Sequence, residues 1–147
     1  MNNDNLVVVV ANHSVLRVKR RKLGVVYLDQ LQKAITPETI LISVMAANNE
    51  IGTLQPIKEI GAIAKEHGIL FHTDAVQAFG QIPINVDECH IDMLSSSGHK
   101  INGPKGIGFL YIRKGVKIRS FVHGGAQERK RRAGMHPSPG HKPRRDD

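Results

Sequence analysis

The sequence predicts an α/β domain with a mostly parallel sheet and flanking helices. Three observations lead to this prediction: short apolar runs that suit buried strands, two segments with apolar residues at helical spacing, and the alternation of the two kinds along the chain. Strand, helix and strand in this order build a parallel sheet. The chain has 147 residues, of which 40% are apolar and 23% charged, and this composition is typical of one globular domain.

Two helices are expected. Apolar residues recur every three or four positions in residues 28–35 and again in residues 57–64, which is the spacing of one helix face. Pro56 suits the first position of the second helix, and Gly68 suits its C-terminal cap. A turn is expected between the first helix and the strand that follows it, at residues 36–39.

Four apolar runs are expected to be strands: residues 41–45, 69–72, 91–94 and 107–112. Residues 116–122 form a weaker fifth candidate. The crossover between the second and third runs is short and contains Pro83, which predicts a poor helix or a 3₁₀ helix there.

The net charge of +8 lies at the two ends of the chain. Residues 1–22 carry +4, residues 129–147 carry +5, and residues 23–128 carry only −1. Basic ends can bind phosphate backbones, so a nucleic-acid-binding module is an alternative function. The aromatic residues that RNA-binding surfaces interleave with basic ones are missing, and this favours solvated ends.

These observations predict three regions. Residues 1–22 form a basic segment in which only the valine run suggests a strand, residues 23–128 form the domain, and residues 129–147 form a basic, disordered tail. The single cysteine excludes a disulfide framework within the chain. No apolar run approaches the roughly 18 residues of a membrane span, and no signal peptide is recognisable. A soluble, cytoplasmic protein with no membrane partner is therefore expected.

Polar residues follow three of the expected strands, in residues 48–50, 73–77 and 95–100. Ligands of parallel sheets bind beyond the carboxyl ends of the strands, so these loops are the candidate site. Asp74 can cap the next turn or pair with a protonated heterocycle nitrogen. Lys100 follows a small, polar loop and is placed to attack a carbonyl as an amine. A zinc site of His72, Asp74 and His99 is disfavoured, because the sequence has no HxxxH or CxxC spacing.

Four segments resemble, in order, the motifs of cysteine desulfurases, which are class V aminotransferases within the fold type I enzymes that depend on pyridoxal 5′-phosphate (PLP). The segments are residues 48–52 (NNEIG), 72–77 (HTDAVQ), 97–106 (SGHKINGPKG) and 123–129 (HGGAQER). The resemblance runs from about residue 23 to residue 134. It implies that the chain is part of the large domain of a fold type I PLP-dependent transferase.

The resemblance implies a catalytic role for Lys100, as the lysine that forms a Schiff base with PLP. It implies that Asp74 pairs with the pyridinium nitrogen and that Gln77 donates a hydrogen bond to the phenolate oxygen of the cofactor. It further implies that Ser97 and His99 contact the phosphate.

The resemblance also implies that Asn49 lies near the cofactor ring and the substrate carboxylate. Family members convert L-cysteine to L-alanine and leave a persulfide on a catalytic cysteine. Close relatives act on selenocysteine, so a selenocysteine lyase or another class V PLP enzyme is the alternative within the family. A homodimer and a sulfur acceptor, such as an iron–sulfur scaffold protein, are the implied partners.

Complete members of the family are longer, and their remaining parts supply the nucleophilic cysteine and an arginine for the substrate carboxylate. We therefore expect this chain to be an incomplete and inactive fragment. Cys89 lies between two of the PLP motifs, where the family has no nucleophile, so a small and partly buried cysteine is expected instead. His13 is the only candidate for the histidine that stacks on the ring, and its surroundings do not match.

Overall fold

The computed structural model describes residues 7–11, 14–17, 24–120, 122–125 and 127–133. His13 and the tail from residue 134 lie outside the described residues, so the predictions for them stay predictions. The elements within the described residues are β1 (Val7–Ala11), β2 (Ser14–Arg17), α1 (Leu28–Ala34), β3 (Thr39–Met45), α2 (Ile57–Glu66), β4 (Leu70–Asp74), β5 (Met93–Ser97), the 3₁₀ turn η1 (Gly98–Lys100), β6 (Gly108–Ile112) and α3 (Gln127–Lys130).

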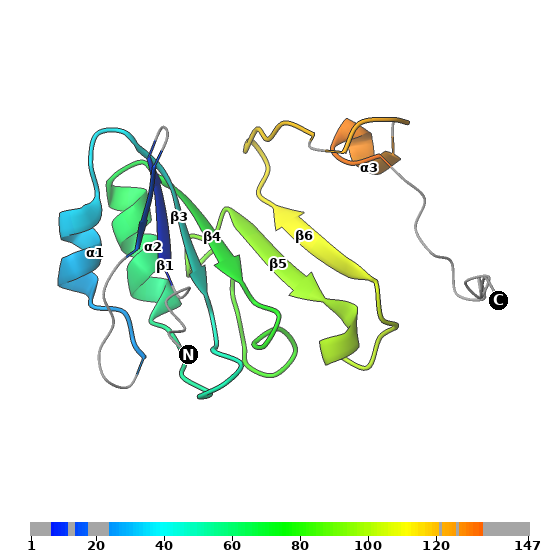
Figure 1. The fold of residues 1–147 in the computed structure, drawn as a ribbon, viewed down its shortest axis with the longest axis horizontal. Coiled ribbons are helices and arrows are strands. Elements are labelled where there is room, and N and C mark those ends of the chain that lie inside the picture. The colour runs from blue at the N-terminus through cyan, green and yellow to red at the C-terminus, as the bar shows by residue number, and fades with distance from the viewer. Residues whose placement is uncertain (1–6, 12–13, 18–23, 121, 126, 134–147) are drawn as a thin grey trace.

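The six strands form one sheet in the order β2-β1-β3-β4-β5-β6 (Figure 1). The three central strands are parallel, with Leu41 opposite Leu70 and His72 opposite Met93. The α/β class is therefore confirmed, and the parallel arrangement holds for the strands that precede the polar loops. It does not hold at the edges, where β1 runs antiparallel to β3, β2 to β1 and β6 to β5. Strand β6 returns directly beside β5 after the loop of residues 98–107, and only an antiparallel strand can follow so short a connection.

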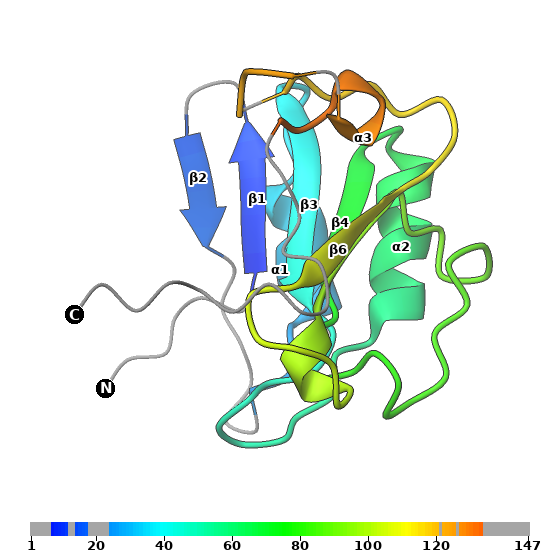
Figure 2. The ribbon, with the colours of Figure 1, turned by 90° about the vertical axis from the view of Figure 1, so that its right-hand side faces the viewer.

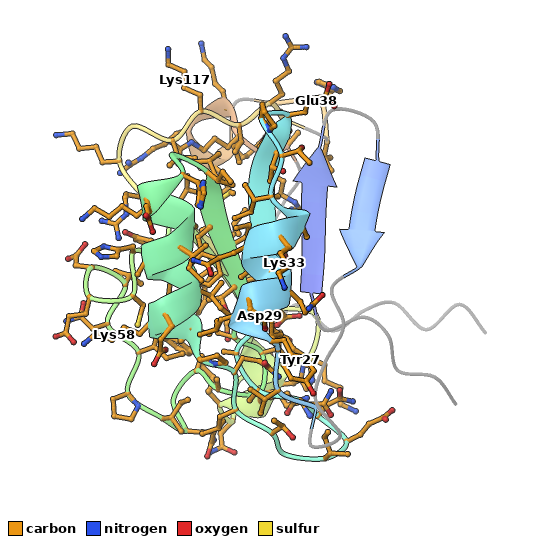
Figure 3. All side chains as sticks on the ribbon, turned by 90° about the vertical axis from the view of Figure 1, so that its left-hand side faces the viewer. Tyr27, Asp29, Lys33, Glu38, Lys58 and Lys117 are labelled. Carbon is orange, nitrogen blue, oxygen red and sulfur yellow. The ribbon has the colours of Figure 1, made fainter. Side chains whose placement is uncertain are left out.

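Both longer helices cover the same face of the sheet, as Figure 2 and Figure 3 show. Their apolar stripes pack on the inward side chains of the central strands, and the fully buried members of this core include Leu31, Ile42, Ile60, Phe71 and Ile91. The outward side of α1 carries the exposed ion pair of Asp29 and Lys33, at 3.7 Å. The amphipathic spacing in the sequence therefore predicted both helices correctly, and α2 begins directly after Pro56 and ends just before Gly68, whose φ is +66°.

Several strand predictions need correction. Residues 1–22 contribute β1 and β2, although the sequence indicated at most one strand there. Strand β5 starts at Met93, so the serines expected in a loop belong to a strand. Residues 116–120 are not a strand, because no neighbouring strand pairs with them in the described part of the chain. The crossover at residues 75–92 contains turns and no helix.

Arg113 holds this helix-free crossover against the end of β6. Its Nη2 donates a hydrogen bond to the carbonyl of Val86 at 2.6 Å, and its Nε donates to the carbonyl of Ile91 at 3.1 Å. Its Nη1 lies 2.6 Å from Oδ1 of Asp87, and its Nε lies 3.6 Å from Oδ1 of Asp92. One guanidinium therefore binds two carbonyl groups and a carboxylate of the crossover at once, because its three nitrogens point in different directions within one plane.

We expect Arg113→Lys to lower the free energy of unfolding by about 1–3 kcal/mol, since an ammonium keeps the charge but cannot reach both carbonyls at once. The ion pair with Asp87 contributes little to this value, because the Asp87 side chain is 79% exposed. Urea denaturation measures the effect. Arg119→Lys, at an exposed residue, is the matched control and should change stability by less than about 0.5 kcal/mol. Equal effects of the two substitutions would contradict the prediction.

No helix in the described part of the chain combines the length and the apolar character that crossing a bilayer requires.

Candidate cofactor site at the carboxyl edge of the sheet

The carboxyl ends of β3, β4 and β5 meet at one edge of the sheet, at the bottom of Figure 1. Asp74 is the last residue of β4 and lies opposite Ser95 of β5. Ser97 ends β5, and the turn η1 carries His99 and Lys100 directly after it. The parallel register therefore brings the loops that follow all three strands to a common edge. All six sequence-predicted site residues lie in or beside these loops.

Asp74 is half-buried, and one of its two carboxylate oxygens already accepts a hydrogen bond. Oδ1 accepts a hydrogen bond from the backbone N–H of Val76 at 2.9 Å, which is the capping role considered for this residue. Within the described residues, Oδ2 has no hydrogen-bond partner. The cap fixes the orientation of the carboxylate and leaves its second oxygen able to accept a hydrogen bond from a ligand. Gln77 follows in the same turn and is also half-buried.

The loop after β3 is shaped by Asn48, a residue to which the sequence analysis gave no role. Its Oδ1 accepts hydrogen bonds from the backbone N–H groups of Glu50 and Ile51, at 2.9 and 3.0 Å. Asn48 is only 4% exposed, whereas Asn49 beside it is exposed at the tip of the turn. An asparagine that starts a turn ending in glycine is a recognisable signal, since its side chain often bonds to backbone two or three residues further on. Asn48 thus holds the backbone that presents Asn49.

The loop after β5 folds back on itself and exposes its polar side chains. Backbone hydrogen bonds of 2.8 Å join Gly98 N to Ile107 O and Gly103 N to Gly98 O. A Cβ atom on Gly103 would lie 2.9 Å from the Gly98 oxygen, so the two glycines permit this close approach. The hydroxyl of Ser97 lies 2.6 Å from Nδ1 of His99. Lys100 is exposed at the end of η1. Imidazole, hydroxyl and amine groups on one compact loop can together bind an anionic group and supply a nucleophile.

His72 connects the three central strands on the face that α1 and α2 do not cover. Its Nδ1 lies 2.7 Å from the hydroxyl of Ser43 on β3, and its Nε2 lies 3.2 Å from the hydroxyl of Ser95 on β5. Both ring nitrogens are therefore engaged, which leaves neither for a metal ion. In the part of the chain that the structure describes, no three His, Cys, Asp or Glu side chains are grouped closely enough to hold a metal.

Burial lowers the pKa of His72 below its ordinary value of 6.5, and the charge of Asp74 opposes this shift more weakly. The unfolded chain then binds a proton at a higher pH than the folded chain does. The contribution of His72 is fully present above about pH 6.5 and is lost as the pH falls toward its folded-state pKa. We expect the urea midpoint to drop between about pH 7.5 and pH 5.5, and to drop less in His72→Gln. His67→Gln, at the exposed end of α2, is the control; an equal pH dependence in wild type and His72→Gln would contradict the assignment.

Cys89 is buried in the crossover, as expected for a cysteine that is not a nucleophile. Burial raises the pKa of the Cys89 thiol above its ordinary value of 9.0, so the reactive thiolate form is disfavoured. The HGG segment near residue 123 precedes α3, which lies at the opposite end of the sheet in Figure 1. This segment therefore does not reach the candidate site within one chain.

A family match defines the class of protein to which this fold and this edge of the sheet belong. The sequence profile of the family "Aminotransferase class-V" matches residues 7–139, and the chain belongs to this family. Within the family, the chain resembles the cysteine desulfurases. It is 66% identical over 119 residues to "Cysteine desulfurase IscS" of Methanosarcina thermophila, and 57% identical over 118 residues to the protein of the same name from Rickettsia prowazekii. These alignments cover 81% and 79% of this chain, and 30% and 29% of the relatives.

Solved structures are similar to this chain in both fold and sequence. A structure titled "SspA in complex with cysteine" superposes with a TM-score of 0.82 at 46% identity, over 86% of this chain and 37% of that one. A "NifS-like protein" superposes with a TM-score of 0.78, also at 46% identity, over 82% of this chain and 34% of that one. The expected family and fold are therefore confirmed. This chain spans about a third of the length of these relatives.

Proposed function

We propose that this chain carries the PLP-binding edge of a cysteine desulfurase. The observation that supports it is the parallel pairing of β4 with β5, in which Asp74 lies opposite Ser95, two residues before the loop with His99 and Lys100. An acid at the end of β4 and an amine in the turn after β5 thus reach the same edge of the sheet.

The residues of this edge fit PLP chemically. The Oδ2 atom of Asp74 would accept a hydrogen bond from the pyridinium nitrogen, since the Val76 N–H holds Oδ1. Ser97 and His99, whose side chains lie 2.6 Å apart, would hold the phosphate together with backbone N–H groups of the glycine-containing loop. Gln77 would donate to the phenolate oxygen, and Asn49 would lie beside the ring. The bound cofactor supplies an electron sink for the bonds to the substrate α-carbon.

Lys100 would hold PLP covalently through its amine. The lysine side chain is exposed at the end of the turn η1, so its amine would be able to approach a ligand held between Asp74 and the loop. The same amine would take up or return a proton at the substrate α-carbon. L-cysteine is the proposed substrate class. A homodimer, a sulfur acceptor and a cytoplasmic location remain proposals taken from the resemblance.

The test mixes the purified 147-residue chain with PLP, reduces the product with borohydride, and locates the modified lysine by mass spectrometry. We expect modification at Lys100, and we expect Lys100→Ala to abolish both this modification and the visible absorption of covalently bound PLP. Lys105→Ala is the matched control, since Lys105 is an exposed lysine of the same loop. Modification spread over several lysines, or undiminished in Lys100→Ala, would overturn the proposal.

A further inference from the structure

We propose that His72 is a positioning residue, which holds Asp74 in place against the loop of residues 97–100 by bridging Ser43 and Ser95. The inference rests on the proposed function, because the place of Asp74 matters only if its carboxylate binds the cofactor. The resemblance implies no role for His72, whose residue type alone suggested only a ligand of the disfavoured metal site.

The need for such a bridge follows from the short overlap of β4 and β5. Three residue pairs join them, His72 with Met93, Thr73 with Leu94 and Asp74 with Ser95, and one backbone hydrogen bond flanks the pairs on each side, Asp92 N to Phe71 O and Ala75 N to Ser95 O. The backbone ladder repeats every two residues, so a slip of two residues would keep the hydrogen-bonding pattern and the faces of the strand. Such a slip would move Asp74 by roughly 6–7 Å relative to β5. The backbone pattern alone therefore does not exclude this displacement of the carboxylate, and side-chain contacts must add to it.

The contact of His72 with Ser95 distinguishes the native register of β4 and β5 from a slipped one in which Met93 takes the place of Ser95. Its Nε2 reaches diagonally to the hydroxyl of Ser95, the residue directly opposite Asp74, at 3.2 Å. Its Nδ1 reaches the hydroxyl of Ser43, its own register partner on β3, at 2.7 Å. A two-residue slip in one direction would put Met93 in the place of Ser95 and break the bridge, whereas a slip in the other direction would put Ser97 there. The neutral imidazole has one donor and one acceptor, and serine hydroxyls can complement both.

The strength of two backbone hydrogen bonds at the carboxyl edge shows whether the His72 bridge holds the candidate site in place. Ala46 N donates to Asp74 O at 2.8 Å, and Ala75 N donates to Ser95 O at 2.9 Å. They join the ends of β3, β4 and β5 beyond His72. If the bridge fixes this edge, its loss should loosen these two bonds more than it loosens the helices on the other face.

The experiment compares His72→Phe, which keeps a ring and removes both hydrogen bonds, with the wild-type chain. Amide hydrogen exchange at Ala46 and Ala75 should accelerate roughly tenfold, as for the loss of about 1.4 kcal/mol, while amides of α2 change little. His67→Phe, at an exposed position, should leave the exchange at both alanines unchanged. Unchanged exchange in His72→Phe would overturn the bridge, whether or not the chain binds PLP.

A double-mutant cycle then tests positioning of Asp74. We expect His72→Phe to weaken PLP binding roughly tenfold in the wild-type background and less than about twofold when Asp74 is already Asn, since the two effects share one path. A merely structural role would give the same factor in both backgrounds and would overturn the proposal. If His72→Phe does not fold, His72→Asn with the same cycle replaces it. Failure of the wild-type chain to bind PLP would refute the proposed function, whereas equal factors refute only the role of His72.

Discussion

Replacing Gly61 with alanine should destabilise the domain by about 3 kcal/mol or more, because overpacking a tight contact costs 1–3 kcal/mol and this contact involves backbone. Gly61 lies within α2, where it packs on the crossover that leads to β5. A Cβ atom at this position would lie 1.9 Å from the carbonyl oxygen of Cys89 and 3.1 Å from Cδ1 of Phe71. Neither can yield easily, since the carbonyl belongs to a hydrogen-bonded turn and Phe71 is fully buried.

Helix propensity alone predicts that Gly61→Ala stabilises the chain, whereas the close contact predicts that it destabilises the chain. The measurement therefore distinguishes the two effects. Glycine inside a helix is about 1 kcal/mol less favourable than alanine, so a loosely packed helix would gain stability from Gly61→Ala. Urea unfolding of the two chains distinguishes these cases. Gly68→Ala is the matched control: its φ is +66° and nothing lies within 4 Å of its Cβ position, so it should cost only about 1–2 kcal/mol of backbone strain. A Gly61→Ala chain at least as stable as wild type would show that α2 stands clear of the crossover.

The elements that the sequence predicts well are those whose local pattern agrees with their packing. The apolar spacing of α2 corresponds to the buried residues Ile60, Ile63 and Ala64. Asp74 was expected just after a strand of residues 69–72, because a buried apolar run precedes it, and the parallel rule then placed Lys100 at the same edge; β4 in fact runs on to Asp74. Both inferences use only residues close together in the sequence and one general rule of sheet topology.

The incorrect predictions concern residues whose structure depends on partners far away in the sequence. Ser95 and Ser97 were expected in a loop because they are small and polar, but they belong to a strand whose outer face is not covered by α1 or α2 (Figure 2). Polar residues are acceptable on such a face, and Ser95 is bonded there by His72. The partner serines of His72 are 29 and 23 positions away. Only the register of three strands brings them together, so no local pattern could reveal the bridge.

Gln55 is the position at which loss of polar groups should have the next largest effect. Its side chain is 6% exposed and joins two segments that are distant in sequence: Oε1 accepts from the N–H of Val26 at 3.0 Å, and Nε2 donates to the carbonyl of Gly24 at 2.8 Å. Gln55→Met keeps the length of the side chain but leaves both buried backbone groups without a partner. Each orphaned group costs about 1–3 kcal/mol, so we expect a total loss of about 2–6 kcal/mol in urea unfolding.

The same substitution should also loosen the candidate site, because Gln55 closes the loop that presents Asn49. The backbone of that loop is held by Gln55 N to Ala46 O at 2.9 Å and by Asn48 N to Thr53 O at 2.9 Å. Limited proteolysis of Gln55→Met should therefore cut within residues 48–55 before it cuts elsewhere in the domain. Gln32→Met, at an exposed position of α1, is the control and should change neither stability nor cleavage. A loss below about 1 kcal/mol in Gln55→Met would mean that other donors and acceptors satisfy Val26 and Gly24, and the amide would then have no special part in holding this loop.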